Sequence, residues 1–416
     1  MSRQDIDSRS LSYYAWKRLR KNKLAVSGMF IIGLAIVVAI LGALIRPDSS
    51  LHANDQKLQL GKKKPGFSVS ILKVKKNGDI PTTYFWEQLL FGGAENPYQI
   101  IPFYSYEFQD DQIVLEEYTG NNEKLPGKKT SFHIADVVYN IDSDNKYDKL
   151  GTGSISFYTD GKEQTADIAT LTEQIKAELI TTKTFWLGTD QFGRDLLSRL
   201  MAGTLVSLSV GFISVFISLI IGIFLGAIGG FFRGWLDDGI MWIINVVWSI
   251  PTLLLVIAIT FALGKGFWQI YVAVGLTMWV EVARIVRGQV ISLREKEFIE
   301  AGTALGFSNN RIITKHVLPN VMGPVIVISA ANFASAIIIE AGLSFLGIGI
   351  QPPMASWGRM IKEHYGFITG DGAYLAILPG LAIMLMVLAF MLVGNGLRDA
   401  LDTTSIMSGS GKVKAK

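Results

Sequence analysis

The chain has 416 residues, of which 50% are hydrophobic, and its formal net charge is +4. This length and apolar content allow a multispan membrane unit plus one modest additional domain. The chain contains no cysteine, which excludes disulfide frameworks and metal or redox sites built on cysteine.

The N-terminal segment, residues 1–23, contains seven Lys or Arg and two Asp. Its apolar residues Leu11, Ala15, Trp16 and Leu19 fall near one side of a helix, with basic residues around them. This pattern predicts a cytoplasmic amphipathic helix in the membrane interface, anchored by an aromatic side chain. A secretory signal fits less well, because the following apolar stretch is too long and no small-residue cleavage site is obvious.

Residues 24–45 are expected to form the first transmembrane helix. The stretch 24–44 is uncharged, and its 21 residues, at about 1.5 Å each, match the ~30 Å hydrocarbon core of a bilayer.

The composition becomes polar at Arg46, and no apolar run of membrane length follows until the segment after residue 184. We therefore expect residues 46–184 to form an inserted extracytoplasmic α+β domain. Short stretches of alternating apolar and polar residues, or of β-branched residues, predict its strands, and apolar residues at helical spacing predict one helix. The expected strands are 67–71, 113–115, 137–139 and 154–157, with a turn at Asp160-Gly161 and a helix over 168–179.

The segment after the insert reads L-G-T-D-Q-F-G-R-D over residues 187–195. Thr189 or Asp190 is expected to cap a helix, and two acid–base pairs have i,i+4 spacing. These pairs are Asp190–Arg194 and Asp195–Arg199. A structural role is favoured over direct contact with a substrate.

Five further apolar segments predict membrane spans, at 204–232, 239–264, 266–283, 320–339 and 372–397. Their many small residues suit close helix packing in lipid. Asn245 and Asn332, polar residues inside two of these spans, are candidate pathway or gate residues. The expected fold class is an all-α polytopic membrane protein with six transmembrane helices and the inserted α+β domain.

Basic residues are distributed unequally between the two sides of this arrangement. The side of the termini carries 18 Lys or Arg, and the short loops of the opposite side carry three. The positive-inside rule then predicts that both termini are cytoplasmic and that residues 46–184 are outside.

A charged, helix-forming stretch lies between the fourth and fifth predicted spans. Small and apolar residues at helical spacing end at Gly306, which can adopt the left-handed turn after a helix. Residues 307–310 have the composition of a turn and N-cap for a second short helix, which Pro319 is expected to end. The alternative is a helical hairpin that merely joins two spans.

This stretch resembles the EAA loop of permease subunits in binding-protein-dependent ABC importers. The family pattern is E-A-A, three residues, G, nine residues, then I-x-L-P. Gly302 replaces the third small residue of the pattern, and His316 stands where many members have Ile. With Asn320, the ending H-x-L-P-N is similar to the oligopeptide/dipeptide/nickel branch, and to its second oligopeptide permease. The residues that the resemblance places in contact with an ATPase subunit are Glu300, Ala301, Gly302, Gly306, His316, Leu318 and Pro319.

The resemblance implies a five-helix permease core over 185–400, a cytoplasmic EAA loop over 284–319 and a cytoplasmic tail over 401–416. It implies a multi-pass protein of the bacterial inner membrane that imports oligopeptides or dipeptides. Its implied partners are two ABC ATPase subunits, a paralogous permease, an extracytoplasmic substrate-binding protein and the lipid bilayer. ATP and Mg would belong to the ATPase subunits, so this chain would be no enzyme and hold no cofactor.

Glu340 lies twenty residues beyond Asn320, which places it about 30 Å along the helix and near the outer face. A carboxylate at that depth is either a pathway or gate residue or an interfacial acid that reaches water, and both remain open. The Gly- and Pro-rich run after it fits a re-entrant outer loop more than a helix.

Catalytic and metal-binding chemistry is not visible in the sequence. The tail imitates part of a phosphate loop, but Ile406 and Val413 break the pattern. Nucleic-acid binding is not expected, since the basic residues map to the membrane face. Two alternatives remain: the same architecture importing nickel or another small solute, or a membrane-anchored extracytoplasmic binding or scaffold protein. The four histidines, which show no ligand spacing, are at 52, 133, 316 and 364.

Overall fold

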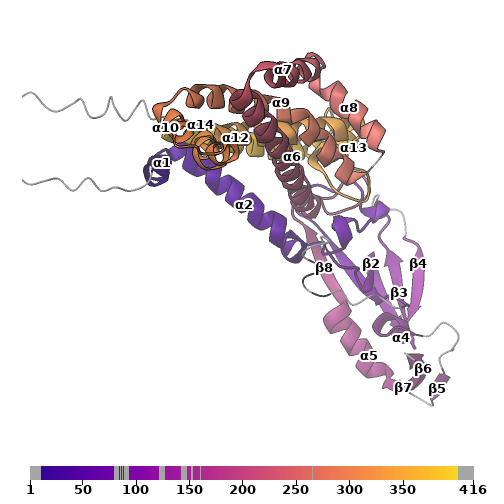
Figure 1. The fold of residues 1–416 in the computed structure, drawn as a ribbon. Helices are drawn as coiled ribbons and strands as arrows, with labels where there is room; N and C mark the ends of the chain where they lie inside the picture. The colour runs from indigo at the N-terminus through magenta and orange to yellow at the C-terminus, as the bar shows by residue number, and fades with distance from the viewer. Residues whose placement is uncertain are drawn as a thin grey trace, which may run out of the picture. The chain divides into compact units, whose positions relative to one another are not determined.

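The computed structural model of the chain divides into two compact units (Figure 1). The helical unit comprises Met1–Ala39, Gly203–Tyr365 and Ala376–Lys416, and the mixed unit comprises Ile40–Ala202 and Gly366–Leu375. The residues that the structure describes are 11–78, 84, 86, 88, 93–120, 127–141, 148–150, 153–159, 161–264 and 266–401. Predictions on residues 1–10, Asp160, Lys265 and the tail 402–416 lie outside them.

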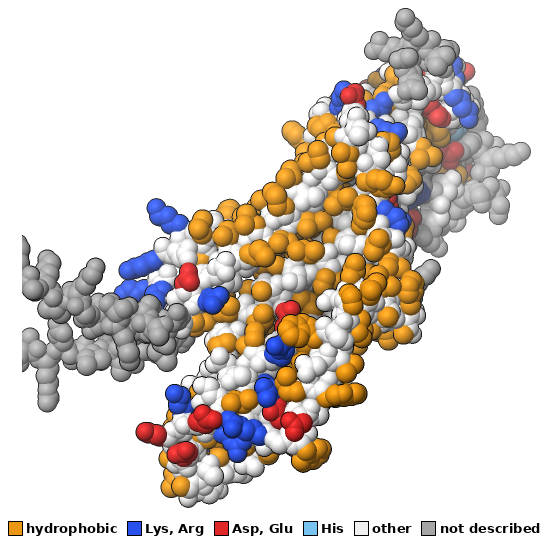
Figure 2. Space-filling view, turned by 90° about the horizontal axis from the view of Figure 1, so that it is seen from above, with side chains coloured by type: hydrophobic (Ala, Val, Ile, Leu, Met, Phe, Trp, Pro, Cys, Tyr) orange, Lys and Arg blue, Asp and Glu red, His pale blue; other side chains and the backbone are white. Residues whose placement is uncertain are grey.

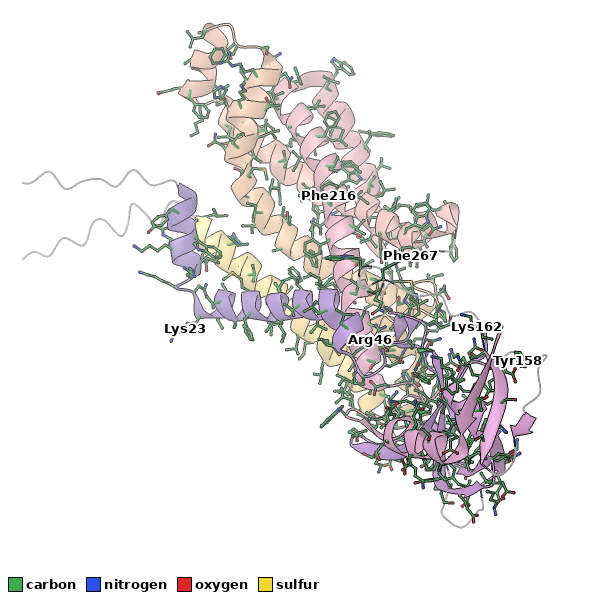
Figure 3. The ribbon with its side chains drawn as sticks, turned by 90° about the horizontal axis from the view of Figure 1, so that it is seen from below. Lys23, Arg46, Tyr158, Lys162, Phe216 and Phe267 are labelled. Atoms are coloured by element: carbon green, nitrogen blue, oxygen red, sulfur yellow. The ribbon has the colours of Figure 1, made fainter. Side chains whose placement is uncertain are left out.

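Long helices make up most of the described chain. The N-terminal pair is α1 (Leu11–Leu19) and α2 (Lys23–Ile45), and Figure 3 labels Lys23 and Arg46 at the two ends of α2. The later helices are α6 (Leu196–Phe232), α7 (Gly234–Ser249), α8 (Thr252–Leu263), α9 (Phe267–Arg294), α10 (Glu297–Ala304), α11 (Asn309–Ile312), α12 (Leu318–Leu346), α13 (Trp357–His364) and α14 (Tyr374–Leu401).

Five of these helices are long and apolar enough to cross a membrane: α2, α6, α9, the run from α11 to α12, and α14. Large hydrophobic side chains along them are exposed, such as Phe30, Phe216 and Phe224. Figure 2 shows hydrophobic side chains over much of the visible surface, with Lys and Arg in separate groups. Such a surface fits lipid rather than water, so the chain is a polytopic membrane protein.

The predicted span 239–264 is wrong as a single straight helix. The structure breaks it into α7 and α8, which meet at an angle of 97°. Pro251 causes the break, because proline has no N–H to donate and forces the preceding Ile250 into extended geometry (φ −90°, ψ 128°). The pair is therefore a broken span or a re-entrant loop, and the number of spans is five, or six if the pair counts as one.

Pro319 does not end a helix, contrary to the prediction. The chain runs from α11 through a π-helical turn, Ile313–Val317, directly into α12. Pro319 is tolerated because it lies in the first turn of α12, where its missing N–H costs little. The predicted span 320–339 is also too short, since α12 continues to Leu346 and stops at Gly347, whose φ is +88°.

The mixed unit is built on antiparallel sheets. Five strands lie in the order β4-β3-β2-β1-β8, and three more in the order β5-β6-β7. Short helices α4 (Ile134–Val138) and α5 (Ile168–Gln174) pack with them around a shared apolar core. The strands are β1 (Phe67–Lys75), β2 (Tyr98–Gln109), β3 (Gln112–Glu117), β4 (Lys129–His133), β5 (Asp148–Leu150), β6 (Ser154–Thr159), β7 (Lys162–Asp167) and β8 (Ile180–Phe185).

The first and last strands of this segment pair with each other. Phe67 of β1 lies opposite Phe185 of β8, so the two ends of the segment come together, as an insertion into another fold requires. Figure 3 labels Tyr158 and Lys162, which belong to the two strands of the β6–β7 hairpin. The domain limits 46 and 184 and the extracytoplasmic placement stay predictions.

The expected strands at 67–71, 113–115 and 154–157 are confirmed, as is the helix over 168–179, which ends in a π turn. The strand expected at 137–139 is wrong, because residues 137 and 138 lie in α4. Ile134 and Val137, one helical turn apart, are both fully buried, and His133 caps the helix through Ala135 N–H. Burial thus overrides the β propensity of the Val-Val-Tyr sequence.

The 187–195 motif forms a buried polar network in the mixed unit. Asp190 accepts a hydrogen bond from Arg194 Nε at 2.5 Å, and both side chains are buried, so the first predicted pair is confirmed. Arg199 Nε lies 3.8 Å from Asp190. The predicted cap is wrong: Asp195, rather than Thr189 or Asp190, accepts the Ser198 N–H at 2.7 Å at the start of α6. Burial raises the pKa of Asp195.

Candidate functional site

The segment from Glu297 to Pro319 forms a compact loop between two spans, which we call the α10–α11 loop. After α10 the chain turns at Gly306, whose φ is +76°. Gly306 N–H donates to Thr303 O and Phe307 N–H to Gly302 O, both at 3.0 Å. These two bonds define a Schellman motif, so the predicted glycine stop is confirmed.

Phe307 brings together two of the residues predicted from the sequence. A Cβ on Gly302 would lie 3.3 Å from the Phe307 ring, so only a very small residue lets the ring lie against α10. The ring of His316 stacks on the Phe307 ring, with the two ring centroids 5.9 Å apart and the two planes inclined by 12°. The guanidinium of Arg311 lies 3.9 Å from the Phe307 centroid.

Phe307 itself was expected only to be part of a turn. A signal for it exists, because a hydrophobic residue directly after the left-handed glycine often packs back onto the helix in a Schellman motif. This packing explains how the loop keeps one shape.

The inner side of the α10–α11 loop is fixed to the helical unit. Ile299, Ile312 and Val317 are buried against a cluster that includes Val286 and Val290 of α9. The outer side is exposed at Glu300, Ala301, Gly306 and Pro319, and Leu318 is half-buried. Leu305 is 73% exposed, which is unusual for a leucine outside lipid. The loop therefore presents a rigid, partly apolar surface for another molecule.

The three predicted pathway residues do not come together. Asn245 is exposed on α7, whereas Asn332 and Glu340 are buried on α12. Glu340 has no exposed surface, which contradicts the alternative that it is an interfacial acid in contact with water. Its carboxylate accepts a hydrogen bond from Ser344 Oγ at 2.6 Å, and Ser344 Oγ accepts one from Ile350 N–H at 3.1 Å. Glu340 thus supports the turn after α12.

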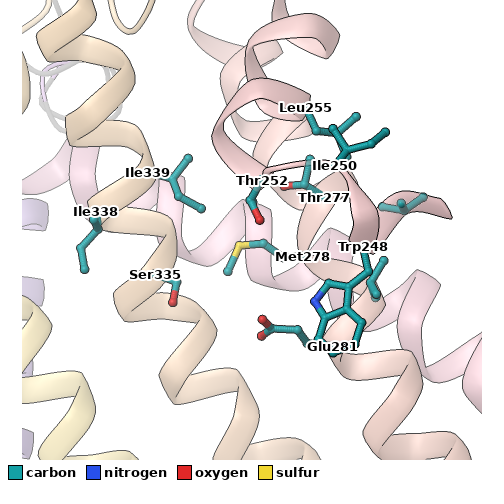
Figure 4. Close-up of a pocket in the computed structure, with 12 residues that line it drawn as sticks. Trp248, Ile250, Thr252, Leu255, Thr277, Met278, Glu281, Ser335, Ile338 and Ile339 are labelled. Carbon is teal, nitrogen blue, oxygen red and sulfur yellow. The ribbon is translucent and has the colours of Figure 1, made fainter. Parts of the chain in front are cut away.

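A cavity of about 310 Å³ lies where the break between α7 and α8 faces α9 and α12 (Figure 4). Its walls are mostly apolar, with hydroxyls from Thr252, Thr277 and Ser335 and one carboxylate, Glu281. The apolar residues in its lining are Val247, Trp248, Ile250, Leu255, Met278, Val280, Ile338 and Ile339.

Glu281 escaped the sequence reasoning, although it lies inside the predicted span 266–283. The signal was present: one carboxylate in an otherwise uncharged apolar run is costly in lipid and marks a functional position.

A second cavity of about 660 Å³ lies between α9, α12 and α14. It contains the polar side chains Gln289, Asn395 and Arg398 among apolar ones. On α9 the two cavities are lined by residues 277, 278, 280, 281, 285 and 289, and on α12 by residues 323, 324, 327, 328, 331, 335, 338 and 339. Steps of three and four residues keep side chains on one helical face. Both cavities therefore lie along one face of α9 and one of α12, which we call the α9–α12 groove.

Close packing against α6 holds α9 in place. Gly222, Gly226 and Gly230 recur every four residues on α6, and a Cβ at Gly226 would lie 2.5 Å from the backbone oxygen of Ala283. At Gly230 it would lie 2.8 Å from the oxygen of Arg287. Glycine stripes of this kind let two membrane helices approach to backbone contact.

Comparisons with known proteins match two parts of the chain. Residues 192–405 match the family described as "Binding-protein-dependent transport system inner membrane component". Residues 10–63 match the "N-terminal TM domain of oligopeptide transport permease C". Residues 64–191, which include the strands from β1 to β8, lie outside both matches.

Three relatives share about half of this chain and most of their own length with it. The dipeptide transport system permease protein DppC of Alkalihalophilus pseudofirmus is 44% identical over 52% of this chain and 71% of its own. The glutathione transport system permease protein GsiD of Pectobacterium atrosepticum is 41% identical over 52% and 72%. The oligopeptide transport system permease protein OppC of Bacillus subtilis is 38% identical over 56% and 75%.

Proposed function

Because the chain belongs to the family of inner-membrane components of binding-protein-dependent transport systems, we propose that it carries peptides through the bacterial inner membrane as a permease subunit of an ABC importer. The observation that carries this proposal is the rigid, exposed α10–α11 loop at the ends of α9 and α12, the two helices that form the groove. Three relatives named for dipeptide, glutathione and oligopeptide transport support a short peptide as the cargo.

The α10–α11 loop is the proposed contact for an ATPase subunit. Its exposed surface combines the Glu300 carboxylate with the apolar Leu305 side chain, a combination suited to a partner's pocket. Two such subunits would hydrolyse ATP with Mg, and this chain would contribute no catalytic residue or cofactor. Force on the loop would reach the spans through the buried contacts of Ile299, Ile312 and Val317.

The α9–α12 groove is the proposed half of the transport pathway. Glu281 and Ser335 are exposed in it, although both lie within membrane spans, so a partner rather than lipid should cover them. A paralogous permease would supply the other half, and an extracytoplasmic binding protein would deliver the cargo. We assign Glu340 to support of the turn after α12, and we propose no pathway role for Asn245 or Asn332.

Orientation is proposed from the excess of basic residues on the side of the termini. At Ser308 a fused green fluorescent protein should fluoresce and a fused alkaline phosphatase should be inactive. At Gly120 the alkaline phosphatase should be active and the green fluorescent protein dark. Paired alkaline phosphatase and green fluorescent protein fusions measure both positions, since the two reporters are active on opposite sides. Cytoplasmic fluorescence at Gly120 would contradict the extracytoplasmic placement of residues 46–184.

Peptide import is tested with the complete complex in proteoliposomes. Co-expressed with its partner permease and ATPase subunits, the chain should co-purify with them. With the binding protein and ATP present, the vesicles should take up radiolabelled tri-alanine. Vesicles without the binding protein are the control. A chain that purifies without ATPase subunits would favour a membrane-anchored binding or scaffold protein. Uptake of Ni²⁺ but not of tri-alanine would favour an importer of nickel.

A further inference from the structure

Glu281 lies at the middle of a membrane-spanning helix. It is 14 residues from Phe267 and 13 from Arg294, the two ends of α9. At about 1.5 Å per residue, each end is roughly 20 Å away along the axis. Glu281 lies within the predicted span 266–283, three residues before Arg284, and a carboxylate inside a membrane span is expensive unless a cation or water accompanies it. Its position therefore requires an explanation beyond packing.

The neighbouring cations on α9 have other partners. The guanidinium of Arg284 lies 3.7 Å from the centroid of the Trp248 ring. Arg287 makes a two-pronged pair with Asp237, at 2.5 and 2.7 Å. Glu281 appears in none of the ion pairs among the described residues. Its charge is thus available to a cation that comes from outside this chain.

The surroundings of Glu281 select the kind of cation. Figure 4 shows its carboxylate directed into the space between Ser335 and Trp248. The side-chain oxygens of the residues that line this cavity belong to one carboxylate and three hydroxyls, while Met278 and Ile339 supply apolar walls. A Ca²⁺ ion takes six to eight oxygen ligands, among them carboxylates and carbonyls, and Mg²⁺ usually binds together with phosphate groups and several waters. A primary ammonium donates only three hydrogen bonds, which a carboxylate and two hydroxyls satisfy.

We propose that Glu281, together with Ser335, binds the positively charged amino terminus of the peptide half-way along the α9–α12 groove. This inference rests on the proposed peptide import. The cavity volume of about 310 Å³ suits one or two residues of a peptide. The apolar walls accept side chains of differing shape, so the charge at Glu281 holds the cargo by a feature that all free peptides share.

Direct contact is tested by zero-length crosslinking of the solubilised complete complex with tri-alanine. A carbodiimide activates a carboxylate, and a primary amine in contact with it then forms an amide, while the carbodiimide takes up water as a urea. Mass spectrometry should find a tri-alanine adduct on Glu281 that saturates with peptide concentration. Asp238, an exposed carboxylate of α7 outside the groove, is the internal control. Equal labelling of the two residues, or no adduct on Glu281, would overturn the proposal.

Transport by variants gives the second measurement. Glu281→Gln should lower tri-alanine uptake about tenfold or more, since a hydrogen bond to a charged group is lost. Glu281→Asp should retain most of it, and Asp238→Asn all of it. If the wild-type complex fails to carry tri-alanine, peptide import itself is wrong. If the wild type carries it and Glu281→Gln does so equally well, only the role of Glu281 is wrong. A Glu281→Gln complex that does not assemble leaves the crosslink on the wild type to decide.

Discussion

Gly306→Val is expected to abolish peptide-stimulated ATP hydrolysis while leaving the spans in the membrane. Gly306 has a φ of +76°, a conformation that costs an L-residue roughly 1–2 kcal/mol and a β-branched one more. Valine would drive the turn out of the left-handed region and break the bonds from residue 306 to Thr303 and from Phe307 to Gly302. The Phe307 ring would then leave His316, and the outer surface around Glu300 would lose its shape.

The matched control is Gly306→Asn, because asparagine tolerates the left-handed conformation better than other residues with a side chain. A Cβ at residue 306 meets no atom within 4 Å, so space is not the difference between the two variants. ATP hydrolysis by the reconstituted complex should fall to its unstimulated rate with valine and stay near the wild-type rate with asparagine. Full peptide stimulation of ATP hydrolysis in the Gly306→Val complex would show that the α10–α11 loop is not the contact for the ATPase subunit.

Gly226→Leu is expected to prevent the helical unit from folding into a stable permease. The added Cβ alone would lie 2.5 Å from the backbone oxygen of Ala283 and 2.8 Å from Val286. Neither the backbone of α9 nor a branched side chain can yield, so α6 and α9 must separate. Overpacking of a core by far smaller additions costs about 1–3 kcal/mol, and here the contact extends along three glycines.

Gly33→Leu is the control for this variant. Gly33 also lies within an apolar span, but a Cβ there meets nothing within 4 Å. We expect the purified Gly226→Leu protein to melt at a clearly lower temperature or to aggregate on size-exclusion chromatography, and the Gly33→Leu protein to resemble the wild type. An unchanged melting temperature for Gly226→Leu would show that α6 and α9 do not pack through their glycines.

Several features could be read from the sequence because their causes are local. Uncharged apolar runs of membrane length predict α2, α6 and α14, since the bilayer thickness fixes the length that a span needs. The turn at Gly306 follows from the freedom of glycine to adopt a positive φ, and small residues at helical spacing precede it. For the same reason the α10–α11 loop could be placed to within a few residues.

Other features depend on neighbours that are distant in the sequence. Val137 belongs to a helix because its side chain fills the core of the mixed unit, although its local sequence favours a strand. Asp195 rather than Asp190 caps α6, because α6 begins only at Leu196 and Asp190 lies in the preceding loop, bound to Arg194. The angle of 97° at Pro251 is set by what packs on each side of the break, whereas the sequence indicates only that a break is possible.

The contrast between two carboxylates in the spans illustrates the difference. The sequence made Glu340 a candidate pathway or gate residue, yet the structure buries it completely beside Ser344. Glu281, one more residue of an apolar run, lines a cavity that α7, α8, α9 and α12 form together. Composition and periodicity determined that this chain crosses the membrane and carries an exposed loop. Only the packing of four helices decided which acid faces the groove, because a cavity arises from the faces of several elements and no single stretch encodes it.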